Sequence, residues 1–107
     1  MLFPCPFLRD EVELSDERKR HIAETHPELL PAHIEQIRDT LFDPDQIRRS
    51  RRFGNARLFS KWYDDPLQGK NMVVVVVSDA EPRKRHWVVT AYVTRRIPEG
   101  DVEWKRS

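Results

Sequence analysis

The hydrophobic pattern changes along the chain from helical spacing before residue 45 to period-two alternation after it. The clearest alternating stretch runs from His86 to Arg96 and predicts a strand. Because side chains alternate across a strand, one face carries apolar side chains that can contact a core: Trp87, Val89, Ala91 and Val93. The other face carries His86, Val88, Thr90, Tyr92 and Thr94. This strand could line both a core and a cleft, although a half-solvated antiparallel strand shows the same alternation.

A first helix is predicted from Ser15 to about His26. Ser15 suits the N-cap, acidic residues follow it in the first turn, and Pro27 disfavours helical geometry in the residue before it. Arg18, Ile22 and His26 are spaced by four and therefore share one stripe of this helix. If Ile22 points inward, a cation and an imidazole flank its contact with the core.

A second helix is predicted from Pro31, which suits the first helical position, to the Pro44 stop. Its apolar stripe consists of Ile34, Ile37 and Leu41. The residues after it predict strands over 46–53, 57–63, 72–77 and 86–96, with a short edge strand over 101–106. On the strand over 57–63, one face carries Arg57, Phe59, Lys61 and Tyr63.

The order of these elements predicts an α+β fold, because both helices precede the strands and no helix separates one strand from the next. We expect two N-terminal helices packed on a four- to five-stranded antiparallel sheet. The length of 107 residues suits a single domain over 1–107. Within it we expect an extended lead-in over 1–13, a core over 14–98 and a short edge strand or tail over 99–107.

Composition restricts the environment of the protein. The single cysteine, Cys5, excludes an internal disulfide and fits a reducing compartment. The longest apolar run, Met72 to Val77, is far too short to span a membrane, and the N-terminal segment lacks the basic start of a secretory signal. We therefore expect a cytoplasmic protein without a membrane partner, unless a larger toxin or phage particle carries it.

The net charge of +1 hides an asymmetry along the chain. Residues 1–45 hold 5 Lys or Arg and 11 Asp or Glu, whereas residues 46–107 hold 14 and 7. The basic half includes clusters at 48–52, 83–85 and 95–96. Such a distribution could attract a polyanion. It is equally consistent with arginines that decorate strand edges and discourage edge pairing.

Candidate chemistry is restricted by what the sequence lacks. Three scattered glycines cannot build a phosphate-binding loop, and His21 and His26 are five residues apart, whereas two helical ligands need a spacing of three or four. We therefore expect neither a metal nor a cofactor. Acid–base chemistry remains, with imidazoles, cations and hydroxyls available at His21, His26, His86, Arg18, Arg57, Lys61, Thr90 and Tyr92.

RNA cleavage by its own 2′-OH needs only these groups: a base, an acid and donors that stabilise the charge on the phosphorus. The plainer interpretation is that each histidine is a structural residue, for example one that caps a helix.

Several segments together resemble one family. ERKRHIAETHPEL, DPDQI, ARLFSKWY, MVVVVV and WVVTAYVTRR are similar, in this order, to the phage-type Barnase–EndoU–colicin–RelE-like (PBECR) nucleases. Members of this family typically show a helical H-I-x-x-x-H-P-E motif, to which residues 21–28 correspond, and a late-strand T-A-Y motif, to which Thr90-Ala91-Tyr92 corresponds. The resemblance covers about residues 14–98.

The resemblance implies a helical layer followed by a curved four-stranded antiparallel sheet, as in Barnase and RelE. It also implies a cleft where the first helix meets the sheet, and metal-independent cleavage of RNA. The implied catalytic residues are His26, a cation supplied by Arg18 or Lys61, and Thr90 with Tyr92. If these converge, His26 and Tyr92 open onto a common cleft.

The sequence therefore favours a toxin-like endoribonuclease of a phage or mobile element that forms 2′,3′-cyclic phosphate ends. An antitoxin or immunity protein is a possible partner. The expected RNA-binding residues are Arg51, Arg52, Arg57 and Arg95. The alternatives are a non-catalytic module that binds RNA or a partner protein, and a structural accessory domain.

Overall fold

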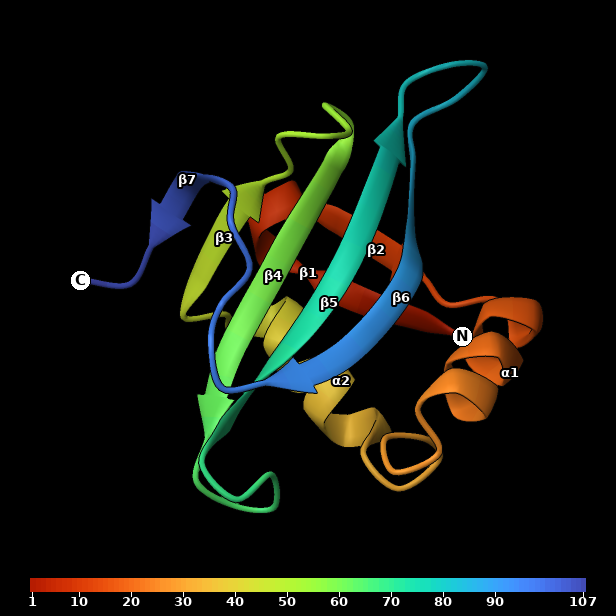
Figure 1. Ribbon diagram of the computed structural model, residues 1–107. Coiled ribbons are helices and arrows are strands. Elements are labelled where there is room, and N and C mark those ends of the chain that lie inside the picture. The colour runs from red at the N-terminus through yellow and green to blue at the C-terminus, as the bar shows by residue number, and fades with distance from the viewer.

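The computed structural model describes residues 1–107 and has an α+β fold with two α-helices and a seven-stranded mixed sheet (Figure 1). The elements are β1 Leu2–Cys5, the 3₁₀ turn η1 Pro6–Leu8, β2 Asp10–Glu13, α1 Asp16–Thr25, α2 Ile34–Phe42, β3 Gln46–Arg49, β4 Ala56–Tyr63, β5 Lys70–Asp79, β6 Arg85–Thr94 and β7 Asp101–Lys105. The strand order in the sheet is β1-β2-β6-β5-β4-β3-β7. No helix is long and apolar enough to cross a membrane.

The predicted four- to five-stranded antiparallel sheet is wrong in strand number and in one pairing direction. The sheet has seven strands, and β2 pairs with β6 in parallel. The two strands that were not predicted, β1 and β2, come from the segment expected to be an extended lead-in. Phe3 of β1 pairs there with Val12 of β2, and both side chains are fully buried. Pro4 is compatible with β1 because β1 is an edge strand and needs no ladder hydrogen bond on its outer side.

Both helices lie where the sequence places them, with one shifted boundary. In α1, the hydroxyl of Ser15 accepts a hydrogen bond from the Arg18 backbone N–H at 3.1 Å, and the helix ends at Thr25, before the predicted break. Ile22 is its only fully buried residue. The second helix begins at Ile34 rather than at Pro31, after a stretch of turns.

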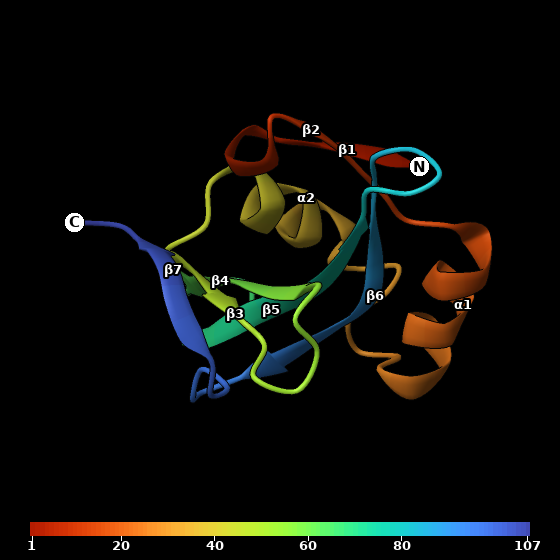
Figure 2. The same cartoon turned by 90° about the horizontal axis from the view of Figure 1, so that it is seen from above.

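The core lies around α2, because the sheet curls over it (Figure 2). Strands β4 and β5 pass on one side of α2, and β1 and β2 pass on the other. Ile37 and Leu41 of α2 are fully buried in one cluster with Phe59 of β4 and Val74 of β5. Helix α1 lies beside β6 and contributes Ile22 to the same cluster. The α2 side of the sheet is thus its core side.

A bulge in β6 changes which side chains face the core. Val75 pairs with Thr90 but Val76 pairs with Val88, so Val89 has no partner on β5. Because one extra residue inverts the alternation, His86 and Val88 lie on the same side as Ala91 and are buried. The predicted faces are therefore correct beyond the bulge and wrong before it.

The connection from β6 to β7 crosses the face of the sheet opposite α2 (Figures 1 and 2). The Arg48 guanidinium donates to the Pro98 carbonyl at 3.0 Å, which holds this connection on β3. Strand β7 then pairs with β3 as the second edge of the sheet. This return brings the C-terminal residues next to β3 and β4.

Candidate functional site

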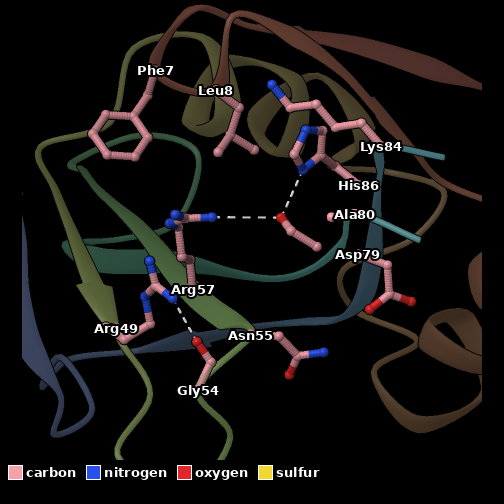
Figure 3. Close-up of a pocket in the computed structure, with 11 residues that line it drawn as sticks. Phe7, Leu8, Arg49, Gly54, Asn55, Arg57, Asp79, Ala80, Lys84 and His86 are labelled. Atoms are coloured by element: carbon pink, nitrogen blue, oxygen red, sulfur yellow. Dashed lines mark hydrogen bonds between the residues drawn. The ribbon is translucent and has the colours of Figure 1, made fainter. Parts of the chain in front are cut away.

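A cleft of about 690 Å³ opens at one end of the sheet, on its core side (Figure 3). The β3–β4 turn, the β5–β6 turn and η1 surround it, and we call it the basic cleft. Its lining residues are Phe7, Leu8, Arg49, Gly54, Asn55, Arg57, Ser78, Asp79, Ala80, Lys84 and His86.

Two hairpins place a row of polar side chains on the wall of the basic cleft. Arg49 and Arg57 are direct partners across β3 and β4, next to one turn. Ser78 and His86 are direct partners across β5 and β6, next to the other turn. Arg57 pairs with Val76, two residues before Ser78, so all four side chains share one face of four adjacent strands. We call these four residues the polar row.

Hydrogen bonds connect three members of the polar row (Figure 3). Arg57 Nη1 donates to Ser78 Oγ at 3.5 Å, and Ser78 Oγ lies 2.6 Å from His86 Nδ1. On the other side of the ring, His86 Nε2 lies 3.4 Å from Asp10 Oδ2 of β2, without hydrogen-bond geometry. The Asp10 carboxylate favours a proton on Nε2, which leaves Nδ1 to accept the hydroxyl proton of Ser78.

The environment of His86 favours its neutral form. The residue is only 5% exposed, and burial lowers its pKa from the usual 6.5; the positive charges of Lys84 and Arg57 act in the same direction, and Asp10 opposes them. A neutral imidazole near pH 7 can accept a proton. His86 therefore combines a hydrogen-bonded position in a cleft with the protonation state of a base.

Glu103 of β7 holds the two arginines of the polar row. Its carboxylate forms ion pairs with Arg49 and with Arg57 Nε, the latter at 3.2 and 3.3 Å. The hydrogen bond from Arg49, followed by the charge of Arg57, keeps the Glu103 pKa below its usual 4.5. At neutral pH this carboxylate therefore neutralises part of the positive charge beside the cleft.

Of the residues expected to be catalytic, Lys61 lies apart from the others. Its ammonium donates to the Asp43 carbonyl at 2.8 Å and to the Asp43 carboxylate at 3.0 Å, on the α2 side of the sheet. Thr90 and Tyr92 lie on the opposite side, because they pair with Val75 and Val73. The expectation that Lys61 joins their hydroxyls at one phosphate is wrong.

Arg18 lies on α1, beside β6, and His26 is the residue that directly follows this helix. His26 is partly exposed and its Nδ1 lies 3.5 Å from Glu28 Oε1. No cavity of the structure is lined by both His26 and Tyr92, so the common cleft expected for them is absent.

The four expected RNA-binding residues are divided between the two ends of the sheet. Arg57 lines the basic cleft. Arg51 and Arg52 are exposed on the β3–β4 turn beside it, where Arg51 pairs with Asp101 and Arg52 lies over Phe53. Arg95 follows the far end of β6, nine residues from His86, or roughly 30 Å along an extended strand.

Sequence reasoning missed most of the basic cleft. The pairing of Ser78 with His86 could have been found by closing the β5–β6 hairpin symmetrically about its turn. The contacts of Asp10 and Glu103 depend on pairings between distant segments, for which the sequence carries no local signal. Burial raises the pKa of the Cys5 thiol, which disfavours the reactive thiolate. No three His, Cys, Asp or Glu side chains come together as metal ligands.

Comparisons with known proteins found no matching family model, curated protein or solved structure.

Proposed function

We propose that the protein is a metal-independent endoribonuclease whose reaction takes place in the basic cleft. One observation carries the proposal: an imidazole, a hydroxyl and a guanidinium lie side by side on the wall of one open cleft, in the order His86, Ser78, Arg57. The 2′-OH of RNA supplies the nucleophile, so the protein needs to move protons and to stabilise phosphate charge.

Each residue then has a defined role. Asp10 keeps the proton of neutral His86 on Nε2, and His86 acts as the base through Ser78: Nδ1 takes the Ser78 hydroxyl proton while Ser78 Oγ takes the proton of the attacking 2′-OH. As the 2′-oxygen forms its bond to phosphorus, the bond to the 5′-oxygen of the next nucleotide breaks, and that oxygen takes up a proton from water. Arg57 and Lys84 stabilise the negative charge that develops on the phosphate oxygens.

The closest alternative is a module that binds RNA, or a partner such as an antitoxin, without cleavage. The observation in its favour is that the Glu103 carboxylate forms ion pairs with both Arg49 and Arg57, so a phosphate must compete with this carboxylate for the two guanidiniums. A toxin-like role in a phage or mobile element belongs to the first proposal and rests on the family resemblance alone.

Incubation with mixed RNA in the presence of a chelator separates the two functions. The nuclease produces 2′,3′-cyclic phosphate ends, whereas the binding module leaves the RNA intact. Arg57→Gln is expected to lower the cleavage rate by about 10²-fold, because it removes one donor to the phosphate. Arg85→Gln is the matched control, since Arg85 precedes His86 but lies over Trp87 and pairs with Glu13. Intact RNA with wild-type protein contradicts the proposal.

A further inference from the structure

A second cavity, of about 280 Å³, adjoins the basic cleft, and aromatic rings dominate its lining. Phe7 of η1, Phe42 of α2 and Trp104 of β7 lie around it, together with Pro6, Asp43, Pro44 and Ile47. We call this cavity the aromatic groove. These three rings come from three separate elements and belong to the few large apolar side chains that the fold leaves exposed, at 37%, 53% and 37%.

The aromatic groove and the basic cleft share a wall. Phe7 lines both cavities, and the Arg57 guanidinium lies 5.9 Å from the centre of its ring. Along β3, Ile47 lines the groove and Arg49 lines the cleft. These residues are two apart on one strand face, or about 7 Å. A site rich in aromatic side chains therefore lies next to the cationic site.

This arrangement matches the chemistry of a nucleotide, which joins a flat aromatic base to an anionic phosphate. Stacking on aromatic side chains is the main way in which proteins hold unpaired bases, and it accepts every base because each has a π-face. Burying three partly exposed rings under a ligand also removes apolar surface from water.

We infer that the aromatic groove is a nucleobase-binding subsite, which holds the base of a nucleotide whose phosphate lies in the basic cleft. This inference rests on the proposed function, because it assigns the phosphate site to the polar row. It adds that the substrate is single-stranded, since only an unpaired base can enter the groove.

Trp104 provides a direct measurement of base binding. In the double variant Trp62→Phe, Trp87→Phe, the remaining tryptophan, Trp104, reports on the groove. The probes are the four nucleoside 5′-monophosphates and ribose 5-phosphate, which lacks only the base. We expect saturable quenching of Trp104 fluorescence by one or more of the nucleotides. Ribose 5-phosphate should cause no quenching, but it should compete with the nucleotides.

A pair of matched variants tests the location. Phe42→Leu should weaken nucleotide binding roughly tenfold and leave ribose 5-phosphate binding unchanged, because only the stacking surface is reduced. Phe53→Leu is the control, since Phe53 is 61% exposed and lines neither cavity. Equal affinity for nucleotides and ribose 5-phosphate, or equal losses in both variants, overturns the inference.

Failure of the proposed function is distinguishable from failure of the subsite. If RNA is not cleaved but the groove binds bases, adenosine alone should still quench Trp104 fluorescence. If RNA is cleaved but Phe42→Leu and Phe53→Leu cleave and bind equally well, the groove is not a base subsite.

Discussion

The hydroxyl of Ser78 lies 2.6 Å from Nδ1 of His86, and the two residues are direct partners across β5 and β6. The strand register therefore fixes this contact without any help from a loop. The buried imidazole faces Ser78 on one side and Asp10 on the other. Titration of His86 should consequently be coupled to folding.

The pH dependence of stability tests this coupling. Because burial lowers the His86 pKa below 6.5, the unfolded chain binds the proton more tightly than the folded protein does. The contribution of neutral His86 is present above pH 6.5 and is lost as the pH falls through the folded-state pKa. The difference in unfolding free energy between wild type and His86→Gln should shrink over this range. The measurement is urea unfolding at a series of pH values, with His21→Gln on exposed α1 as the control. A constant difference would show that the folded-state pKa is not lowered.

The contact of Glu103 with Arg49 and Arg57 predicts an increase in RNA affinity when the carboxylate is removed. Glu103→Gln frees two guanidiniums beside the basic cleft, so RNA binding measured by fluorescence anisotropy should tighten. Glu99→Gln is the control, because the Glu99 side chain is 93% exposed and its carboxylate comes no nearer than 3.9 Å to the Arg51 guanidinium. Weaker binding by Glu103→Gln would mean that the carboxylate orients the arginines instead of competing with phosphate.

The surroundings of Gly54 and Gly100 predict a large difference between the effects of the same substitution on stability. A Cβ at Gly100 would lie 2.8 Å from the Arg49 carbonyl oxygen, so Gly100→Ala must displace the start of β7 and should cost about 1–3 kcal/mol of stability. A Cβ at Gly54 meets nothing within 4 Å, and Gly54→Ala should change stability by less than about 0.5 kcal/mol. Thermal unfolding of both variants measures the difference. Equal stability would show that β7 is not held closely on β3.

The exposed cations of the β3–β4 turn predict salt-dependent RNA binding. Arg52 lies next to the basic cleft, and its guanidinium lies over the Phe53 ring without an ion pair. If it contacts one phosphate of single-stranded RNA, Arg52→Ala should reduce the slope of log affinity against log salt by about 0.7. Arg20→Ala on α1 should leave the slope unchanged. Binding by the wild type that does not weaken with salt would contradict a phosphate-binding role for the turn.

The elements that the sequence predicted correctly are those that depend on nearby residues, such as a helix cap or a run of β-branched side chains. The Ser15 cap and the Pro27 break define α1, and the β-branched run after Met72 identifies a buried strand. The faces of β4 followed simple alternation, since Phe59 lies in the core and Tyr63 reaches Asp39 of α2 at 2.9 Å. These features depend on neighbours in sequence, which a single chain displays directly.

The site was harder to predict because it depends on register and on distant pairing. The Val89 bulge placed His86 on the α2 side, away from Thr90 and Tyr92, and nothing in the alternating pattern marks such an insertion. The docking of β7 on β3, which positions Glu103, requires the chain to cross from β6 past β5, β4 and β3. The histidine that lines the basic cleft is therefore His86 and not His26.

The most direct test of the account is RNA cleavage by His86→Gln and His26→Gln, measured in chelator with 2′,3′-cyclic phosphate ends as the readout. Glutamine retains hydrogen-bonding atoms but cannot transfer a proton at neutral pH, and circular dichroism confirms that each variant is folded. His86→Gln should lower the rate by about 10²–10⁴-fold, whereas His26→Gln, at a partly exposed residue just after α1, should cleave like the wild type. Full activity of folded His86→Gln, or loss of activity in His26→Gln alone, would contradict the account.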